Sequence, residues 1–456
     1  MITVKAEIPV YGGYTIARGD EGIVFLSGAL PGETVRAVVG EKRKDYRVAA
    51  VSEVLEPSPA RTEPFCPHFG RCGGCHLQYA SYESQVAMKN AIIEDCFRRI
   101  AGIEAAPLAP PITGPDTGYR HRAQFKVSAP GPAAGAAGFF KTGTREIVPI
   151  ASCPLLALPV NEALGNIWRM IEDGGGGGLT GVGEIHVTAG YQNNSHLNSS
   201  GEGAALLPFG HDTGADIGRA GLSGPGLSEP GLSALIPGRG FDEALGGRFA
   251  QNGFDTVFFG DGSYRGRGFT AFNLAGFLYT VSPASFFQSN WRLNLQAVEA
   301  AVESLGPLDG GLLLDIYSGG GNFSIPLSPS AGRIICVEEN ASSIKDAARN
   351  IEINQIRNMK FIKSPFEKIK MASSLIKGGR LAAAIADPPR PGLTREAVKK
   401  LLELEPERLL YISCNPATLA RDVKKLLEKY SVISVRLADF FPHTYHLEVL
   451  CLLGRI

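Results

Sequence analysis

Cys414 lies on a predicted turn between a strand and a helix, and its thiol is the side chain of this chain best placed for covalent chemistry. Cys414 follows the apolar run Leu409–Ile412, which predicts a buried strand. Pro416 lacks a backbone donor and disfavours helical geometry at the residue before it, so the chain must turn there and a helix is expected to start near Thr418. A thiol at the carboxyl end of a strand lies where open α/β sheets bind ligands, so it can act as a nucleophile. Taken alone, a single cysteine is more often a small buried hydrophobic side chain.

A glycine-containing loop and an acid follow two other predicted strands. Asp315 opens the loop DIYSGGGNF, and Glu338 lies at the end of the next predicted strand. Glycines let the backbone approach a ligand closely, and an acid at this spacing binds ribose hydroxyls in doubly wound folds. No Gly-Lys-Ser/Thr follows the loop, which argues against a nucleoside triphosphate site. The alternative for Glu338 is a surface carboxylate.

Two further acids, Asp387 and Glu448, lie next to predicted strands. Asp387 begins the sequence DPPRPG, in which the prolines fix a rigid turn at a strand end and direct the carboxylate into the crevice. Glu448 precedes the last predicted strand and is a candidate general base. His443 and His446 compete with Glu448 for that role, and packing is the alternative for both histidines.

A second group of candidate ligands lies in the N-terminal half. Three cysteines have the spacing C-x5-C-x2-C in CPHFGRCGGC, and glycines between the last two let the backbone fold tightly around one centre. Cys153 is the best candidate for a fourth ligand, because proline follows it as it follows Cys66. Four thiolates suit either zinc or an iron–sulfur cluster. The predicted ligands are Cys66, Cys72, Cys75 and Cys153, with His68 and His76 as alternatives.

Composition limits the classes of protein that this chain can be. Its 456 residues suggest more than one domain, and 44% hydrophobic with 20% charged residues is ordinary for a globular cytoplasmic protein. We expect no signal peptide and no membrane contact, because no apolar run approaches the roughly 20 residues of a membrane span. The formal net charge is zero, so any RNA contact must come from local patches. The eight cysteines are too few for a secreted disulfide scaffold.

The elements that must position these residues fall into three predicted domains. Residues 1–60 contain short β-rich runs that predict a small barrel, with a modest basic patch between Arg36 and Arg47. Residues 61–282 hold the cysteines, a helix from Ser81 to Ala101 and a basic strand whose Arg120, Arg122 and Lys126 could contact phosphate or simply face solvent.

The predicted central domain contains a segment of a different composition, and the third domain follows it. Residues 173–237 are rich in Gly, Ser and Pro, which predicts a flexible insertion. Residues 283–456 alternate strands with helices, which predicts a mostly parallel sheet covered on both faces. The expected fold class is therefore α/β in the C-terminal domain, with an N-terminal β-barrel and a central α+β domain.

Five motifs in order resemble those of the RNA (uracil-C5)-methyltransferase family: FFQSN, DIYSGGGNF, DPPRPG, YISCNPATLARD and FPHTYHLE. The start ARGDEGIVFLSGALPGE resembles a TRAM domain, an RNA-binding module, and CPHFGRCGGC resembles the [4Fe–4S] site of the same family. Together these two features resemble the branch that acts on 23S rRNA. Ser318 departs from the pattern, since family members often carry Cys there.

The resemblance implies a class I, Rossmann-like methyltransferase dependent on S-adenosylmethionine. It implies Cys414 as the nucleophile that attacks uracil C6 and Glu448 as the base that removes the C5 proton. It places cofactor contacts at Gln288, Tyr317, Asn322, Glu338 and Asp387 and a [4Fe–4S] cluster on Cys66, Cys72, Cys75 and Cys153. The target base must leave its stack to reach such a crevice.

The implied partner is RNA, with 23S rRNA as the expected substrate and tRNA as the alternative; neither DNA nor a membrane is expected, and the protein is expected to be a monomer. Two other hypotheses stay open at this point. One is a non-catalytic RNA-binding factor that keeps the fold, and the other is a redox or iron sensor built on the cluster. A structural role for the cluster is the simplest expectation.

Overall fold

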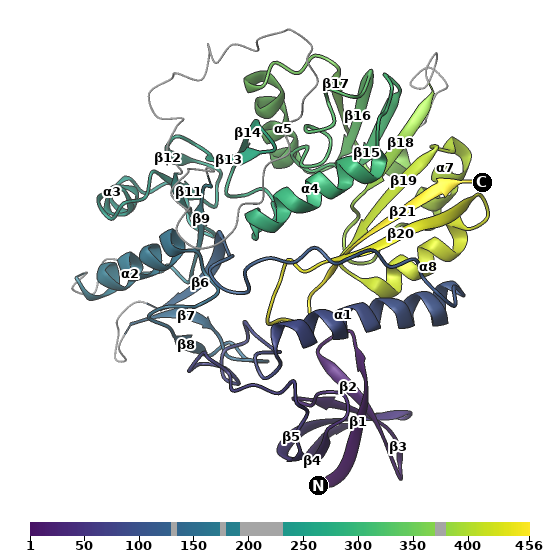
Figure 1. Cartoon of the computed structure of the whole chain (residues 1–456). Helices are drawn as coiled ribbons and strands as arrows, with labels where there is room; N and C mark the ends of the chain where they lie inside the picture. Colours follow the sequence, from purple (N-terminus) through teal and green to yellow (C-terminus); the bar gives the residue numbers. More distant parts are fainter. Residues whose placement is uncertain (129–134, 174–178, 192–230, 370–379) are drawn as a thin grey trace, which may run out of the picture.

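The computed structural model describes residues 1–128, 135–173, 179–191, 231–369 and 380–456. In that part of the chain, an N-terminal barrel, a central sheet and a C-terminal sheet follow one another, and a two-stranded sheet separates the last two along the sequence (Figure 1). Most of the segment predicted as a flexible insertion lies outside the described residues. No helix in the described ranges is long and apolar enough to cross a membrane.

The N-terminal residues form the small barrel that the sequence predicts. Its strands close in the order β1-β2-β3-β5-β4. Alternate residues point inward, as Val24 and Leu26 do in β3, so the module has its own core. The strands are β1 (Ile2–Val10), β2 (Tyr14–Gly19), β3 (Gly22–Ser27), β4 (Thr34–Lys42) and β5 (Tyr46–Glu56).

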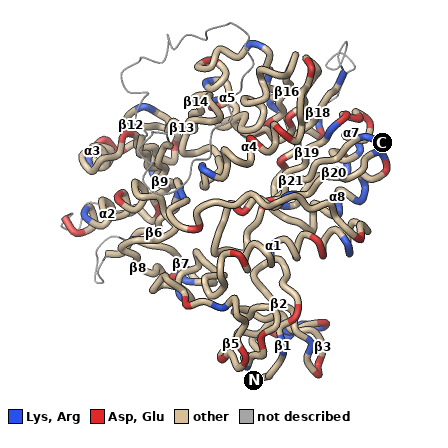
Figure 2. Tube along the Cα trace, viewed as in Figure 1, with Lys and Arg blue, Asp and Glu red and all other residues tan. Residues whose placement is uncertain are grey.

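The basic patch predicted on this barrel is largely neutralised. Four of its residues form ion pairs: Arg36 with Glu53, Lys42 and Arg47 with Glu21, and Arg43 with Glu41. Charges of both signs are likewise interspersed along the rest of the chain (Figure 2). Charge alone therefore gives little reason to expect RNA on the barrel.

The central sheet has the strand order β12-β11-β10-β9-β6-β7-β8 in the described ranges. Helix α2 covers it with Val160, Leu164 and Ile167, which recur at helical spacing and are fully buried. The elements are β6 (Arg122–Ser128), β7 (Ala136–Phe140), β8 (Ile147–Pro149), α2 (Leu158–Glu172), β9 (Glu184–Ala189), β10 (Leu232–Ile236), α3 (Glu243–Gln251), β11 (Thr256–Phe259) and β12 (Tyr264–Gly266).

Two sequence predictions for this region need correction. Residues 232–236 fall in the segment predicted as a flexible insertion, but they form strand β10. This strand pairs with both β9 and β11 and is an inner strand of the sheet. The basic strand does not present a free basic face. Arg122 donates to the backbone carbonyls of Pro283 and Ser285 at 2.6 and 2.7 Å, and Lys126 forms an ion pair with Glu184 at 2.5 Å.

Helix α1 (Tyr82–Cys96) continues as a π-helical turn, Phe97–Ala101, over the range that the sequence predicts. The Ser81 hydroxyl caps it by accepting a hydrogen bond from the backbone nitrogen of Ser84. Its apolar face, including Ile93, packs on the C-terminal sheet and not on the central one. The helix expected within the central domain is therefore part of the C-terminal core.

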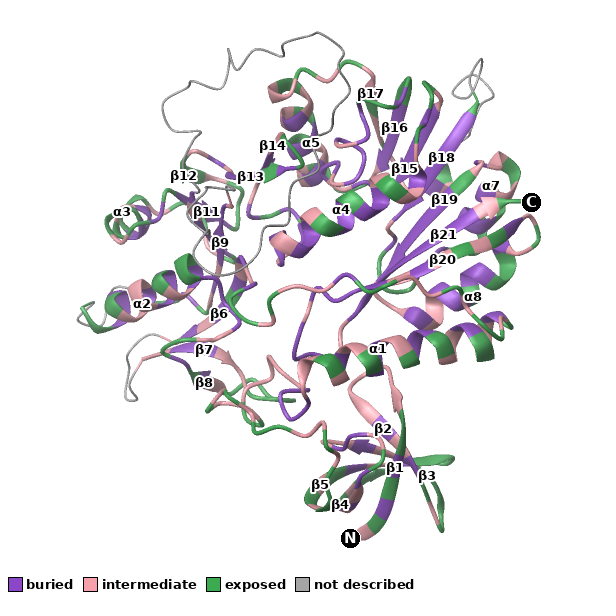
Figure 3. Cartoon of the chain, viewed as in Figure 1, coloured by how far each residue is buried: buried purple, intermediate pink, exposed green. Residues whose placement is uncertain are grey.

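The C-terminal sheet has the strand order β17-β16-β15-β18-β19-β21-β20 in the described ranges. Its inner strands β15 and β18 are buried on both faces (Figure 3), by α4 on one side and by α1, α7 and α8 on the other. The elements are β13 (Thr270–Leu274), β14 (Phe277–Val281), α4 (Trp291–Leu305), β15 (Leu312–Ile316), β16 (Arg333–Glu338), α5 (Ala341–Ile353), β17 (Met359–Lys363), β18 (Leu381–Ala386), α7 (Arg395–Leu404), β19 (Arg408–Ser413), α8 (Pro416–Leu426), β20 (Tyr430–Ala438) and β21 (Glu448–Arg455).

A buried ion pair fastens α1 to the loop between β20 and β21. The ammonium of Lys89 lies 2.6 Å from a carboxylate oxygen of Asp439 and 3.1 Å from the carbonyl of Phe441. Both charged side chains are almost completely excluded from water, at 1% and 0% exposure. Losing one partner would leave the other charge buried without compensation.

We expect Lys89→Met to lower the free energy of unfolding by about 3–5 kcal/mol, because it isolates the Asp439 carboxylate. Urea unfolding followed by circular dichroism measures this. Lys399→Met is the matched control, since its ion pair with Glu403 is exposed and such pairs contribute at most about 1 kcal/mol. Adding Asp439→Asn to Lys89→Met should recover part of the loss. Equal unfolding midpoints for Lys89→Met and Lys399→Met would contradict this account.

Candidate active site

The polar motifs predicted from the sequence meet at one edge of the C-terminal sheet. β15, β16, β18 and β19 are parallel, so their carboxyl ends face the same way (Figure 1). These ends carry Asp315, Glu338, Asp387 and Cys414. β21 runs antiparallel to β19 and begins with Glu448, which brings Glu448 to the same edge. Since Ser413 pairs with Val449, Cys414 and Glu448 are neighbours at the end of this ladder.

The turn that carries Cys414 is fixed by the start of α8. The side-chain oxygen of Asn415 accepts hydrogen bonds from the backbone nitrogens of Ala417 and Thr418 at 3.0 and 3.3 Å, so Asn415 caps the helix. The helix begins at Pro416 and not near Thr418 as predicted, because proline suits the first helical position. The half-buried Cys414 thus stands just before a capped helix.

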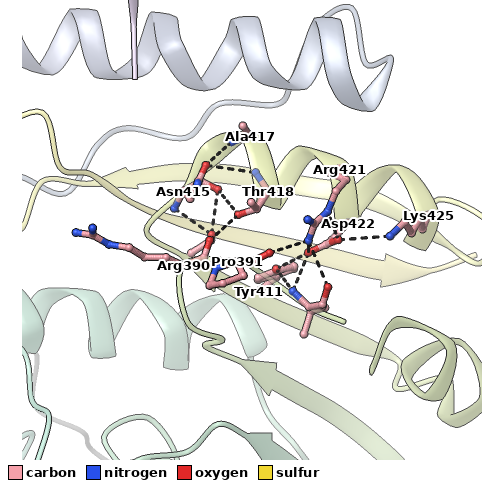
Figure 4. Close-up of polar contacts among 11 residues, drawn as sticks. Arg390, Pro391, Tyr411, Asn415, Ala417, Thr418, Arg421, Asp422 and Lys425 are labelled. Atoms are coloured by element: carbon pink, nitrogen blue, oxygen red, sulfur yellow. Dashed lines mark hydrogen bonds and ion pairs between the residues drawn. The ribbon is translucent and has the colours of Figure 1, made fainter. Parts of the chain in front are cut away.

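Hydrogen bonds join this turn to the loop after β18 (Figure 4). The hydroxyl of Thr418 donates to the carbonyl of Arg390 at 3.3 Å, and the carboxylate of Asp422 accepts from the backbone nitrogen of Leu393 at 2.8 Å. Asp422 is fully buried and also accepts from the hydroxyl of Tyr411 at 2.9 Å. The DPPRPG loop and the cysteine turn are therefore held in one fixed relation.

Burial controls the protonation of the two candidate catalytic groups. It raises the pKa of the Cys414 thiol to about 11, with Glu448 adding to the effect and Arg390 opposing it. It also raises the pKa of Glu448 well above its ordinary value, with Asp387 adding and Arg390 opposing. The Cys414 thiol is therefore protonated at neutral pH in the free protein, and burial favours the protonated form of Glu448. Arg390 is the cation that favours the ionised form of each.

The two competing histidines lie in different places. His443 is buried, where a ring nitrogen lies 3.1 Å from the side-chain nitrogen of Gln85 and the other lies 3.3 Å from Asp116. His446 has a ring nitrogen 3.4 Å from the guanidinium of Arg390, and burial followed by Arg390 lowers its pKa to about 4. A neutral His446 at the mouth of the site remains close to the chemistry, whereas the contacts of His443 are structural.

The glycine loop after β15 fits a nucleoside-type cofactor. Tyr317 and Gly319 have positive φ angles of 61° and 55°, which bend the loop sharply beyond the strand. The carboxylate of Glu338 accepts a hydrogen bond from the backbone nitrogen of Gly319 at 2.8 Å, so it braces the loop and is not a free surface acid. Asp315 is buried, one carboxylate oxygen has no hydrogen-bond partner within the described residues, and burial raises its pKa to about 7. An unpaired buried acid beside a glycine loop suits a cationic ligand.

Of the other predicted cofactor contacts, Tyr317 and Asn322 belong to this loop. The Asn322 side chain exchanges hydrogen bonds with that of Asn294 at 2.7 and 3.0 Å, and the hydroxyl of Tyr317 donates to Glu367 at 2.8 Å. Burial raises the pKa of Asp387 to about 7. Gln288 lies apart from them in a cleft of about 560 Å³ between β6 and the loop before α4, lined also by Arg120, Arg122, Phe286 and Phe441.

The four predicted cluster ligands line a single cavity of about 60 Å³, together with His68 and Arg120. Among the residues that the structure describes, no three His, Cys, Asp or Glu side chains are grouped tightly enough to hold one metal ion. Burial raises the pKa of Cys75 to about 12, and the neighbouring thiols of Cys153 and Cys72 raise it further while Arg120 opposes them. The cavity thus brings together four thiols, which suit a thiolate-bound group, and the cation of Arg120.

Two residues near Cys414 were not singled out from the sequence. Arg390 is visible in the DPPRPG motif, but only the fold shows that its charge reaches both Cys414 and Glu448. Tyr11 comes from the barrel, and its hydroxyl donates to the carbonyl of Cys414 at 2.9 Å. Nothing in the sequence around Tyr11 indicates a contact with a residue so distant in the chain.

Known proteins resemble this chain along its whole length. The family model "tRNA (Uracil-5-)-methyltransferase" matches residues 271–456. The 23S rRNA (uracil(1939)-C(5))-methyltransferase RlmD of Alkalilimnicola ehrlichii is 31% identical over 97% of this chain and 94% of its own length. The enzyme of the same name from Methylococcus capsulatus is 30% identical over 100% of this chain and 97% of its own.

The fold has a counterpart among solved structures. The tRNA (uracil-54, C5)-methyltransferase of Pyrococcus abyssi, in complex with S-adenosyl-L-homocysteine, has a TM-score of 0.69 and 23% identity, with 99% of this chain and 100% of that chain covered. The archaeal protein of this fold was solved with S-adenosyl-L-homocysteine, which is what remains of S-adenosylmethionine after its methyl group is transferred. The 31% and 30% identity to the two RlmD enzymes along nearly the full length of both chains shows that the protein belongs to the RNA (uracil-C5)-methyltransferase family.

Proposed function

We propose that this protein transfers a methyl group from S-adenosylmethionine to C5 of a uridine in 23S rRNA. The observation that carries the proposal is the adjacent placement of Cys414 and Glu448 at the end of the β19–β21 ladder. Relatives named for 23S rRNA that match the full chain support the choice of RNA. A tRNA uridine is the second candidate, because the archaeal protein of the same fold is named for tRNA. We expect a cytoplasmic monomer.

The chemistry explains why a thiol and a base are both needed. Uracil C5 is a poor nucleophile. When the thiolate of Cys414 adds to C6, a C–S bond forms and the C5–C6 π electrons move onto C5 and O4, so C5 becomes nucleophilic. Bound S-adenosylmethionine supplies an electrophilic methyl group for that carbon. Once C5 is methylated, the carboxylate of Glu448 removes the C5 proton, the C5–C6 double bond re-forms and the thiolate leaves.

The protein must ionise both groups before it can act. The free protein holds Cys414 as a thiol, and burial favours the protonated form of Glu448. Arg390 already favours the charged form of each, and a cationic methyl donor beside Asp387 and Asp315 would remove part of the acidic field that opposes ionisation. The proposed donor contacts are Gln288, Tyr317, Asn322, Glu338 and Asp387.

We propose a [4Fe–4S] cluster on Cys66, Cys72, Cys75 and Cys153. The cavity that these thiols line and the adjacent Arg120, which offsets thiolate charge, support it. Bound there, the cluster would cross-link the 66–75 loop to the segment around Cys153, so we assign it a structural role.

Glu448→Gln should accumulate a covalent protein–RNA adduct that carries the added methyl group, because the C5 proton can no longer be removed. Incubation with unmodified 23S rRNA and S-adenosylmethionine, nuclease digestion and mass spectrometry would detect it. Cys414→Ser should give neither adduct nor 5-methyluridine. Cys96→Ser, a half-buried cysteine on α1, should behave as wild type. An adduct in Cys414→Ser would refute the assigned nucleophile, and a wild type inactive on both rRNA and tRNA would favour the RNA-binding factor.

The value of kcat/KM should rise about tenfold per pH unit between roughly pH 6 and pH 9, because the thiolate fraction of Cys414 grows at that rate below a pKa near 11. Glu448 acts only after methyl transfer, so its ionisation adds nothing to this slope of kcat/KM. Initial rates of methyl incorporation across this range test the slope. A flat profile from pH 6 upward would show that the thiol is already ionised in the free protein.

Protein purified without oxygen should contain about four irons and four sulfides per chain. Cys153→Ser should lose most of the iron and unfold at a lower temperature, because the cross-link is lost, whereas Cys96→Ser should keep both properties. Metal analysis and thermal unfolding give the two readouts. Full iron retention in Cys153→Ser would rule out Cys153 as a ligand, and zinc in place of iron would rule out the iron–sulfur cluster.

A further inference from the structure

The turn between β1 and β2 of the barrel reaches the catalytic edge of the C-terminal sheet. Tyr11 in this turn donates a hydrogen bond from its hydroxyl to the backbone carbonyl of Cys414 at 2.9 Å, across 403 positions of sequence. The accepting carbonyl belongs to the residue that carries the thiol. The bond therefore restrains the peptide unit from which the nucleophile projects.

The same turn also contacts the loop that leads to Glu448. The ring of Tyr11 meets the ring of Tyr445 edge-on, with centroids 5.8 Å apart. Gly13, at φ +82°, lies so close to Tyr445 that a Cβ built on it would be 3.4 Å from the Tyr445 side chain. Tyr445 precedes Glu448 by three residues. One turn of the barrel thus touches the loops that carry both catalytic groups.

The charged surroundings of Tyr11 agree with a donor role. Burial raises the pKa of its hydroxyl to about 12, with contributions from Cys414 and Glu448, while Arg390 opposes them. The hydroxyl therefore keeps its proton at neutral pH and stays a donor. As Cys414 ionises, a donor on the adjacent carbonyl also disperses some of the negative charge that gathers at this turn.

We propose that Tyr11 is a positioning residue for methyl transfer, holding the Cys414 turn against the Glu448 loop so that thiolate and base face the same uracil. The barrel then completes the catalytic site, in addition to any part it has in binding RNA. This inference rests on the proposed roles of Cys414 and Glu448. A competing explanation is that Tyr11 only anchors the barrel through its ring.

Tyr11→Phe separates these explanations, because it removes the hydroxyl and keeps the ring on Tyr445. In the full-length protein, we expect the rate of covalent capture of 5-fluorouridine-substituted 23S rRNA, with S-adenosylmethionine present, to fall about 3- to 10-fold, as suits one lost hydrogen bond. RNA affinity and the unfolding temperature should stay within error of wild type. Fluorine at C5 cannot leave as a proton does, so the adduct persists and its formation can be timed by denaturing electrophoresis.

Tyr14→Phe is the matched control, since Tyr14 is a tyrosine of the next strand that packs on Phe25 within the barrel. It should capture RNA at the wild-type rate. The inference is overturned if Tyr11→Phe also captures at that rate, or if its loss appears only as weaker RNA affinity or a lower unfolding temperature. A wild-type protein that forms no adduct would instead refute the proposed function, so the two failures are distinguishable.

Discussion

The antiparallel pairing of β21 with β19 is the constraint on which the candidate site depends. In a sheet of parallel strands only, Glu448 at the start of a strand would lie at the opposite edge from Cys414 at the end of one. Because β21 reverses direction, its first residue comes beside the residue that follows β19. The register, with Ser413 opposite Val449, makes the nucleophile and the base neighbours. A slip of one residue in this ladder would turn one of the two side chains to the other face.

Several acids lie at one edge of the sheet, where their negative charges are unfavourable to one another but favour a bound cation. Burial raises the pKa values of Asp315, Asp387 and Glu448, and the charge of Asp387 raises those of Asp315 and Glu448 further. Burial is the main cause of the high pKa of Cys414, and the negative charges of Glu448 and Asp387 raise it further. The same charges attract a cationic methyl donor. Binding of the donor and activation of the nucleophile are therefore coupled, since one positive charge favours both.

Sequence reasoning worked best where the determinants are local. The strand before Cys414, the helix Trp291–Leu305 and the cap of α1 follow from apolar runs, polar caps and proline positions within a few residues. It failed where partners come from elsewhere in the chain. The basic patch of the barrel is largely neutralised by Glu21, in the turn between β2 and β3, and by Glu53 of β5. β10 was taken for part of an insertion because its neighbours in sequence are low in complexity, whereas its neighbours in space are strands.

Long-range contacts also decide how the domains cooperate. Arg122 of the central sheet is a half-buried cation whose guanidinium donates hydrogen bonds to the carbonyls of Pro283 and Ser285. Those residues begin the loop that carries Gln288 into the cleft. On the opposite side, the barrel holds the Cys414 turn through Tyr11. The central domain and the barrel thus each restrain one loop of the C-terminal domain through hydrogen bonds to backbone carbonyls. Such bonds fix the position of the main chain and do not depend on the side chains of the loop. The C-terminal sheet therefore provides the edge at which the candidate catalytic residues lie, and the two other domains restrain the loops that carry Gln288 and Cys414.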